Sequence, residues 1–229
     1  MKKPRVLLSE DHAIVAEGLR SLLEDTVDLI GTVGDGRAML ETASRLRPDV
    51  IVADISMPVL NGLDATRQLK TLGIPSKIIF LTMHADLPVA RQAFRAGASG
   101  FLLKHSASHE LISAIHTVLD GGLYITPILT SNPTQFLLEV SQQSDLEAIS
   151  LTPRRREVLQ LIAEGRTMKE VAAILNISSR TAESHKYGLM ERLGVRTTAE
   201  LVQYAIRLGL VEIPIGAIDS EQSHSRTQS

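Results

Sequence analysis

The first 120 residues alternate short apolar runs with longer amphipathic stretches. The apolar runs cover residues 5–9, 28–34, 50–53, 77–82 and 100–103. The stretches that follow them read as helices, at residues 12–24, 37–46, 62–71, 87–96 and 108–119. Strands that alternate with helices form a parallel sheet with helices on both faces and right-handed crossovers. The pattern therefore predicts an α/β domain with five parallel strands.

The pattern changes after residue 120. Residues 121–127 break the alternation, and the stretch up to about residue 150 is rich in Ser, Thr, Gln and Pro, with one short helix predicted at 134–140. From residue 151 the chain reads as helical, at residues 153–164, 168–175, 179–193 and 198–209. We therefore predict an α/β domain at 1–122, a linker at 123–149, a small helical domain at 150–211 and a disordered polar tail at 212–229.

Composition adds a difference between the two halves. Residues 1–150 hold 13 Lys and Arg against 17 Asp and Glu, whereas residues 151–210 hold 10 against 6, so the net charges are -4 and +4. A basic domain joined to an acidic one suggests two functions, one of them toward a polyanion, although ordinary surface charge is an alternative. The chain lacks cysteine, a signal peptide and an apolar run long enough for a membrane span, so we expect a cytoplasmic protein.

Polar side chains stand at the expected ends of four strands. They are Glu10, Asp11, Asp54, Thr82 and Lys104. Each alone has an ordinary explanation as a turn, cap or solvated residue, but together they converge where open α/β sheets bind ligands. Clustered carboxylates require a counter-charge, and Mg²⁺ prefers oxygen ligands. The set suits phosphoryl transfer to Asp54, with Mg²⁺ and Lys104 balancing phosphoryl charge and Thr82 donating a hydrogen bond.

These motifs resemble the receiver domain of two-component response regulators over about residues 4–120. The matching segments are Glu10-Asp11, "DISMPVLNG" from Asp54 to Gly62, Leu81-Thr82 and "GFLLK" from Gly100 to Lys104. The resemblance implies a flavodoxin-like (CheY-like) fold and phosphorylation of Asp54 by a sensor histidine kinase. It implies Mg²⁺ on Glu10, Asp11, Asp54 and the Ser56 backbone carbonyl, with Thr82 and Phe101 as switch residues. Glu10 stands where the family more often has Asp.

The histidines of this half, and the residue two positions after Asp54, also bear on its chemistry. The histidines His12, His84, His105, His109 and His116 match no zinc-ligand spacing, so we assign them surface or loop roles. A phosphatase with an aspartyl nucleophile is a competing interpretation of Asp54. Such enzymes have a second acid two residues after the nucleophile, where this chain has Ser56. We therefore do not class the chain as an enzyme, although a receiver can catalyse its own phosphorylation and hydrolysis.

The basic half contains a predicted helix-turn-helix. Thr152 and Pro153 form a cap and first turn, and two helices at 168–175 and 179–193 flank the tight turn "NISS". The second helix of such a pair can enter a major groove of DNA. From the residues alone, a plain helical interaction domain remains an alternative.

Residues 150–210 also resemble the LuxR-type DNA-binding domain of the NarL/FixJ family. The matching residues include "LTPR" from Leu151, "KEVA" from Lys169, "SRT" from Ser179, His185 and "LGV" from Leu193. The resemblance implies base contacts by Glu183, Ser184 and Tyr187. The charged side chains Lys169, Arg180, Lys186 and Arg196 are then expected on DNA phosphates. Arg155, where the family usually has Glu, and Gly188 inside the recognition helix depart from the pattern.

The last predicted helix has two interpretations. Its residues Leu201, Val202 and Ala205 resemble the family's dimer-forming helix, but they would equally suit the core of the domain itself. The whole chain is thus expected to be a phosphorylation-controlled transcription regulator that binds promoter DNA as a homodimer when active. The alternative is a DNA-binding regulator that ignores phosphate and is controlled by a protein partner.

Overall fold

The computed structural model describes residues 2–83, 85–130, 132–142 and 151–211. The chain divides into two compact units, Met1–Glu157 and Val158–Ser229, and the division falls inside helix α7 (Pro153–Ala163). Our domain boundaries remain predictions. The expectations for His84, for most of the late linker and for the tail at 212–229 lie outside the described residues.

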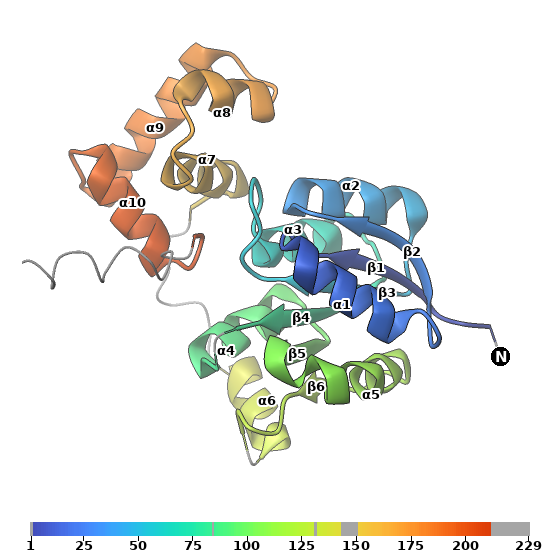
Figure 1. Ribbon diagram of the computed structural model, residues 1–229. Helices are drawn as coiled ribbons and strands as arrows, with labels where there is room; N and C mark the ends of the chain where they lie inside the picture. The colour runs from blue at the N-terminus through green and yellow to red at the C-terminus, as the bar shows by residue number, and fades with distance from the viewer. Residues whose placement is uncertain (1, 84, 131, 143–150, 212–229) are drawn as a thin grey trace, which may run out of the picture. The chain divides into compact units, whose positions relative to one another are not determined.

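One parallel sheet forms the centre of the first unit (Figure 1). Its strands are β1 (Arg5–Ser9), β2 (Asp28–Val33), β3 (Val50–Asp54), β4 (Lys77–Thr82), β5 (Gly100–Leu103) and β6 (Tyr124–Ile125). They lie in the order β2-β1-β3-β4-β5-β6, and every pair is parallel. The prediction of five strands was one short, because the two residues of β6 are too few to show a periodicity.

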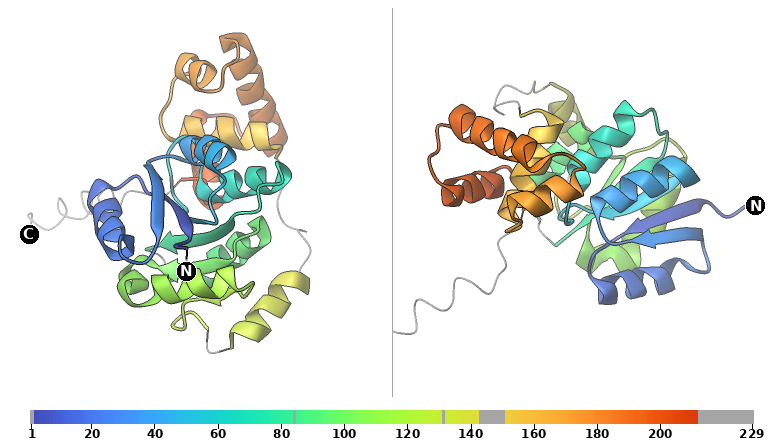
Figure 2. Two further views of the ribbon diagram at one scale, coloured as in Figure 1. Left: turned by 90° about the vertical axis from the view of Figure 1, so that its right-hand side faces the viewer. Right: turned by 90° about the horizontal axis from the view of Figure 1, so that it is seen from above.

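Helices cover both faces of this sheet (Figures 1 and 2). They are α1 (Ala13–Leu23), α2 (Gly36–Leu46), α3 (Gly62–Thr71), α4 (Leu87–Ala96) and α5 (Ala107–Leu119), and a further helix, α6 (Pro133–Gln142), packs against α4. Apolar residues of α1 and α5 pack on one face with alternate strand residues such as Val52 and Leu81, while α2, α3 and α4 pack on the other with Phe80 and Phe101. The predicted helices of this unit begin and end within two residues of these bounds.

The strand order determines where functional side chains can meet. It reverses between β1 and β3, since β1 lies between β2 and β3 while the chain passes from β1 to β2 and then to β3. In open α/β sheets, ligands bind beyond the carboxyl ends of the strands at such a reversal. Asp54 is the last residue of β3, and Glu10 directly follows β1.

The helical unit contains the remainder of α7 and helices α8 (Met168–Ile174), α9 (Ser179–Leu193) and α10 (Thr198–Arg207). Side chains cap all three later helices: Thr167 and Glu170 form a capping box for α8, Ser178 accepts from the Thr181 N–H at α9, and Thr197 with Glu200 caps α10. Gly188 does not interrupt α9. Among the described helices, none is both long and apolar enough to cross a membrane.

Candidate functional site

Asp54 is a buried carboxylate at the end of a buried strand. All five residues of β3 are buried, and Asp54 itself is 6% exposed. Its Oδ1 accepts a hydrogen bond of 3.3 Å from the Ser56 backbone N–H. An ionised carboxylate at such a position is unfavourable unless a charge partner is present.

Lys104 provides that partner. It follows β5 directly, in a short 3-10 turn (Lys104–Ser106), and only 8% of its side chain is exposed. Its Nζ lies 2.6 Å from Asp54 Oδ2 and 2.8 Å from Glu10 Oε2, so one ammonium bridges two carboxylates from different strands. The sequence prediction that strand-end residues meet is confirmed for these three side chains.

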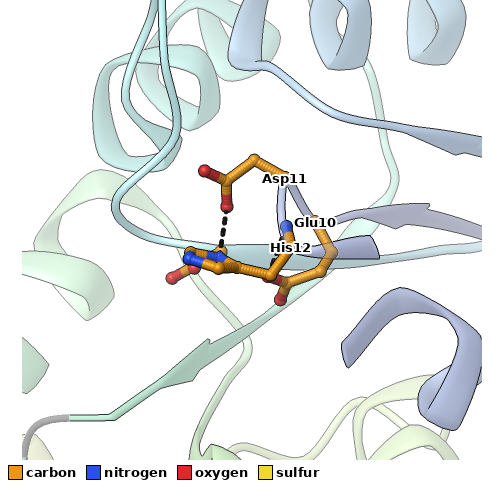
Figure 3. Close-up of side chains that lie close together, drawn as sticks. Glu10, Asp11 and His12 are labelled. Carbon is orange, nitrogen blue, oxygen red and sulfur yellow. Dashed lines mark hydrogen bonds and ion pairs between the residues drawn. The ribbon is translucent and has the colours of Figure 1, made fainter. Parts of the chain in front are cut away.

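The acidic pair lies beside this bridge, together with a histidine (Figure 3). The His12 Nδ1 is 2.8 Å from Asp11 Oδ1 and 3.2 Å from Glu10 Oε1. Glu10, Asp11, His12 and Asp54 each offer one ligand atom, and these four atoms lie within 4.8 Å of one another. The sequence predicts a surface or loop role for His12. It does lie in the loop before α1, but its place directly after Glu10-Asp11 was the signal that it would join the acidic cluster.

The pKa values follow from this crowding. Burial raises the pKa of Asp54, and Lys104 offsets this effect only in part. For Lys104, burial acts to lower the pKa, but the nearby Asp54 and Glu10 together outweigh it, so the pKa lies above its usual value. Lys104 alone therefore does not offset the full cost of ionising the buried Asp54. An added cation at this position would favour the ionised form of Asp54.

The loop after β3 holds its shape through backbone contacts. The Gly62 N–H donates to the Ile55 carbonyl at 2.8 Å, and the Asn61 side chain accepts from Asp64 N to begin α3. Gly36, the first residue of α2, meets this loop so closely that a Cβ there would lie 1.8 Å from the Leu60 carbonyl oxygen. Val59 has a φ of 68°, an unusual conformation for a β-branched residue. The loop after β3 is thus held on one side by its own hydrogen bonds and on the other by the close approach of Gly36 in α2.

Thr82 and Phe101, the predicted switch residues, lie on neighbouring strands. Thr82 ends β4, one residue beyond Leu81, which pairs with Asp54 in the strand register. Phe101 is fully buried in β5 and pairs with Phe80 of β4. Thr82 therefore stands at the same sheet edge as Asp54, and Phe101 lies inside the apolar layer beneath it. Their switch role stays a prediction, as does the role of the Ser56 carbonyl.

The predicted DNA-contacting residues lie mainly at the surface of the helical unit. Glu183, Ser184 and Tyr187 on α9 are exposed, the last of them to 67%. Of the predicted phosphate contacts, Lys169, Arg180 and Arg196 are exposed and Lys186 is partly buried. In α10, Leu201 and Ala205 are fully buried and Val202 is partly exposed. Their burial agrees with the core interpretation, and the dimer interpretation stays a prediction.

Comparison with known proteins identifies both halves. Residues 6–116 match the model described as "Response regulator receiver domain", and residues 149–205 match "Bacterial regulatory proteins, luxR family". The transcriptional regulatory protein MctR of Rhizobium johnstonii is 38% identical over 213 residues, which cover 91% of this chain and 96% of that protein. The chain belongs to the two-component response regulators. Its LuxR-type domain makes it a transcription regulator by family rather than an enzyme.

Other response regulators are similar over nearly the same length. LnrK of Bacillus subtilis is 34% identical, with 90% of this chain and 98% of that protein covered. Among solved structures, the RcsB response regulator of Salmonella typhimurium has a TM-score of 0.57 and 28% identity, with 89% of this chain and 97% of that chain covered. A structure of RcsB with DNA has a TM-score of 0.54 and 29% identity, with 92% and 100% covered. The predicted family and fold class are thereby confirmed.

Proposed function

We propose that Asp54 accepts a phosphoryl group from a sensor histidine kinase and that this modification changes how the LuxR-type domain binds promoter DNA. The observation that carries the proposal is the bridge of Lys104 between Asp54 and Glu10 beside Asp11. A purely structural Asp54–Lys104 pair would need neither Glu10 on the same ammonium nor Asp11 beside it. The proposed setting is the cytoplasm, where kinase and DNA are both accessible.

The chemistry assigns one task to each side chain. A carboxylate oxygen of Asp54 attacks phosphorus, the bond from phosphorus to the kinase's histidine nitrogen breaks, and the imidazole leaves. Lys104 balances charge on the phosphoryl oxygens, and the Thr82 hydroxyl donates to one of them. The same residues would let the receiver catalyse phosphorylation from a small donor and its own hydrolysis.

A divalent cation fits the acidic cluster. Glu10, Asp11, Asp54 and the Ser56 carbonyl would hold Mg²⁺, which when bound supplies positive charge to the phosphoryl oxygens. The fit is supported by the closeness of the three carboxylates, whose charge a cation would balance, and by the raised pKa of Asp54, because burial disfavours its ionised form and a cation would stabilise that form.

Recognition of double-stranded DNA is proposed for α9. The exposed Glu183 can accept from a cytosine amino group, while Ser184 and Tyr187 offer hydroxyl and aromatic contacts to base edges. Lys169, Arg180, Lys186 and Arg196 would contact phosphates. Relatives whose structures are described with DNA support this part of the proposal. We further propose that the active form is a homodimer, in which the partly exposed Val202 contributes to the contact along α10.

Phosphorylation control is tested by a gel-shift assay. DNA is first selected from a random library by the full chain treated with beryllofluoride, a stand-in for the phosphoryl group. We expect beryllofluoride to change the apparent Kd for this DNA by about tenfold, within the usual range of coupled sites. Asp54→Asn should bind DNA with one affinity in both conditions. Equal affinities for the unsubstituted chain would reject the switch and favour the regulator that ignores phosphate.

The salt dependence of binding separates phosphate contacts from base contacts. Each phosphate contact contributes about 0.9 to the slope of log K against log salt concentration. We expect Arg180→Ala to lower that slope by about this amount on every sequence. Tyr187→Ala should leave the slope unchanged and alter the preference between selected and scrambled DNA. A slope unaffected by Arg180→Ala would exclude a phosphate contact for Arg180.

A further inference from the structure

Helix α6 lies in the predicted linker, yet it packs against the receiver. Phe136 of α6 is 4% exposed and meets Phe94 of α4 edge to face, with ring centroids 6.0 Å apart. The Arg91 guanidinium of α4 lies 5.8 Å from the Phe136 ring centroid and pairs with Glu139 at 3.1 Å. Both receiver residues come from α4, and Val140 of α6 also packs against the apolar cluster that contains Phe136.

A second connection runs through β6. This strand pairs with β5, and Phe101 stands opposite Ile125. The Thr126 N–H donates to the Phe101 carbonyl at 3.0 Å, and the Thr126 hydroxyl accepts from Leu103 N at 3.2 Å. Leu103 immediately precedes Lys104, whose ammonium contacts Asp54. The segment that leads to α6 is therefore hydrogen-bonded to the strand that contains Phe101 and that leads directly into Lys104.

These two connections meet in one apolar cluster. Phe101, Ile125, Phe94 and Phe136 all belong to the cluster that α2, α3 and α4 bury against the sheet. Phe101 is already fully buried, so any change of its side-chain position would change the space available to its neighbours, because packed interiors respond to small changes in volume. A change at the phosphoacceptor site that moved Phe101 would therefore reach the packing of Phe136.

Pro133, Thr134, Gln135 and Leu138 of α6 are exposed, which favours reversible docking. Leu138 is 56% exposed, and the Arg91–Glu139 pair is partly exposed. Among the described side chains of α6, the attachment therefore rests mainly on the buried Phe136, with the partly buried Val140 beside the same apolar cluster. A weakly docked helix lies at the low-stability end of a structure and is easily shifted by a ligand.

We propose that α6 is a latch on α4: it is docked when Asp54 is free and is loosened when Asp54 is phosphorylated. Since α6 leads into the segment before the DNA-binding domain, its release would carry the signal out of the receiver. This inference rests on the proposed phosphorylation of Asp54. Coupling between two sites is reciprocal, so weakening the docking of α6 must favour the phosphorylated state by the same factor.

The first measurement is hydrogen exchange of the full chain, followed by mass spectrometry. We expect amides of residues 133–142 to exchange at least about fivefold faster with saturating beryllofluoride, and we expect Asp54→Asn to show no change. Failure of beryllofluoride to bind at Asp54 would overturn the proposed function and the latch together. Binding at Asp54 with unchanged exchange of α6 would overturn the latch alone.

The second measurement uses the reciprocal effect. We expect Phe136→Ala to bind beryllofluoride about fivefold more tightly by calorimetry. Ile128→Ala is the control: this apolar side chain lies between β6 and α6 and is 73% exposed, so the affinity should be unchanged. Phe136→Ala also removes core volume, so a second substitution is needed. Glu139→Lys replaces the Arg91–Glu139 ion pair with two positive charges, which should also weaken the docking of α6 and tighten the binding of beryllofluoride. Adding Arg91→Glu to it should restore the original affinity. Unchanged affinity in both Phe136→Ala and Glu139→Lys would overturn the latch.

Discussion

Replacing Lys104 with methionine is expected to lower the free energy of unfolding by about 3 kcal/mol at neutral pH, because it leaves two buried carboxylates without their cation. Methionine keeps the length of the aliphatic chain, so packing changes little. Glu10 and Asp54 are 4% and 6% exposed, which limits how far water can replace the ammonium. The measurement is chemical denaturation of the metal-free chain followed by circular dichroism.

The pH dependence of this effect has a defined sign. The pKa of Asp54 in the folded chain is raised above its unfolded value, so stability from its protonation is lost as pH rises through the folded pKa. Loss of Lys104 raises that pKa further, and the difference between the two proteins should grow from acid to neutral pH. The folded pKa of Lys104 is also raised. Its stabilisation is therefore complete below the unfolded value of about 10.4 and is lost as pH rises through the folded pKa.

Two comparisons make the Lys104 experiment specific. Lys2→Met removes an exposed lysine and should change stability by less than about 0.5 kcal/mol. Added Mg²⁺ should stabilise Lys104→Met more than the unsubstituted chain, since the cation then replaces the missing charge. A loss below about 1 kcal/mol that is constant from pH 4 to pH 8 would show that Lys104 does not balance the carboxylates.

The residues that meet at the sheet edge could be predicted because parallel strands present their carboxyl ends together. Asp54, Glu10 and Lys104 needed only the strand positions and the alternation of helices to be placed near one another. The family pattern then added the roles of the Ser56 carbonyl and of Phe101, which stay predictions. This part of the site depends on topology, which hydrophobic periodicity reports well.

The features that could not be predicted depend on close contacts rather than on periodicity. Strand β6 has only two residues, which is too few for a hydrophobic periodicity. Its pairing with β5 depends on where the chain after α5 passes beside Phe101. The contact of His12 with the acidic pair depends on the turn after β1. The docking of Phe136 on α4 joins residues 42 positions apart in sequence (94 and 136), and a short amphipathic helix does not reveal which surface it will cover.

Introducing a methyl group at Gly36 should destabilise the receiver by about 3 kcal/mol, although alanine is ordinarily the better helix residue. A Cβ at Gly36 would lie 1.8 Å from the Leu60 carbonyl oxygen and 2.7 Å from its carbon. Both atoms are backbone, so relief requires the loop after β3 or the start of α2 to move by roughly 1 Å or more. That loop also holds Ser56, and we therefore expect weaker stabilisation by Mg²⁺ in Gly36→Ala.

Gly18→Ala is the matched control, because Gly18 also lies in a helix of the same unit and a Cβ there meets no atom within 4 Å. This substitution should raise the free energy of unfolding by about 0.5–1 kcal/mol, since alanine loses less backbone entropy than glycine. The two substitutions add the same methyl group, so their opposite signs isolate the contact with Leu60 from helix propensity. Equal effects of both substitutions, measured by chemical denaturation, would mean that α2 does not constrain the loop beside Asp54.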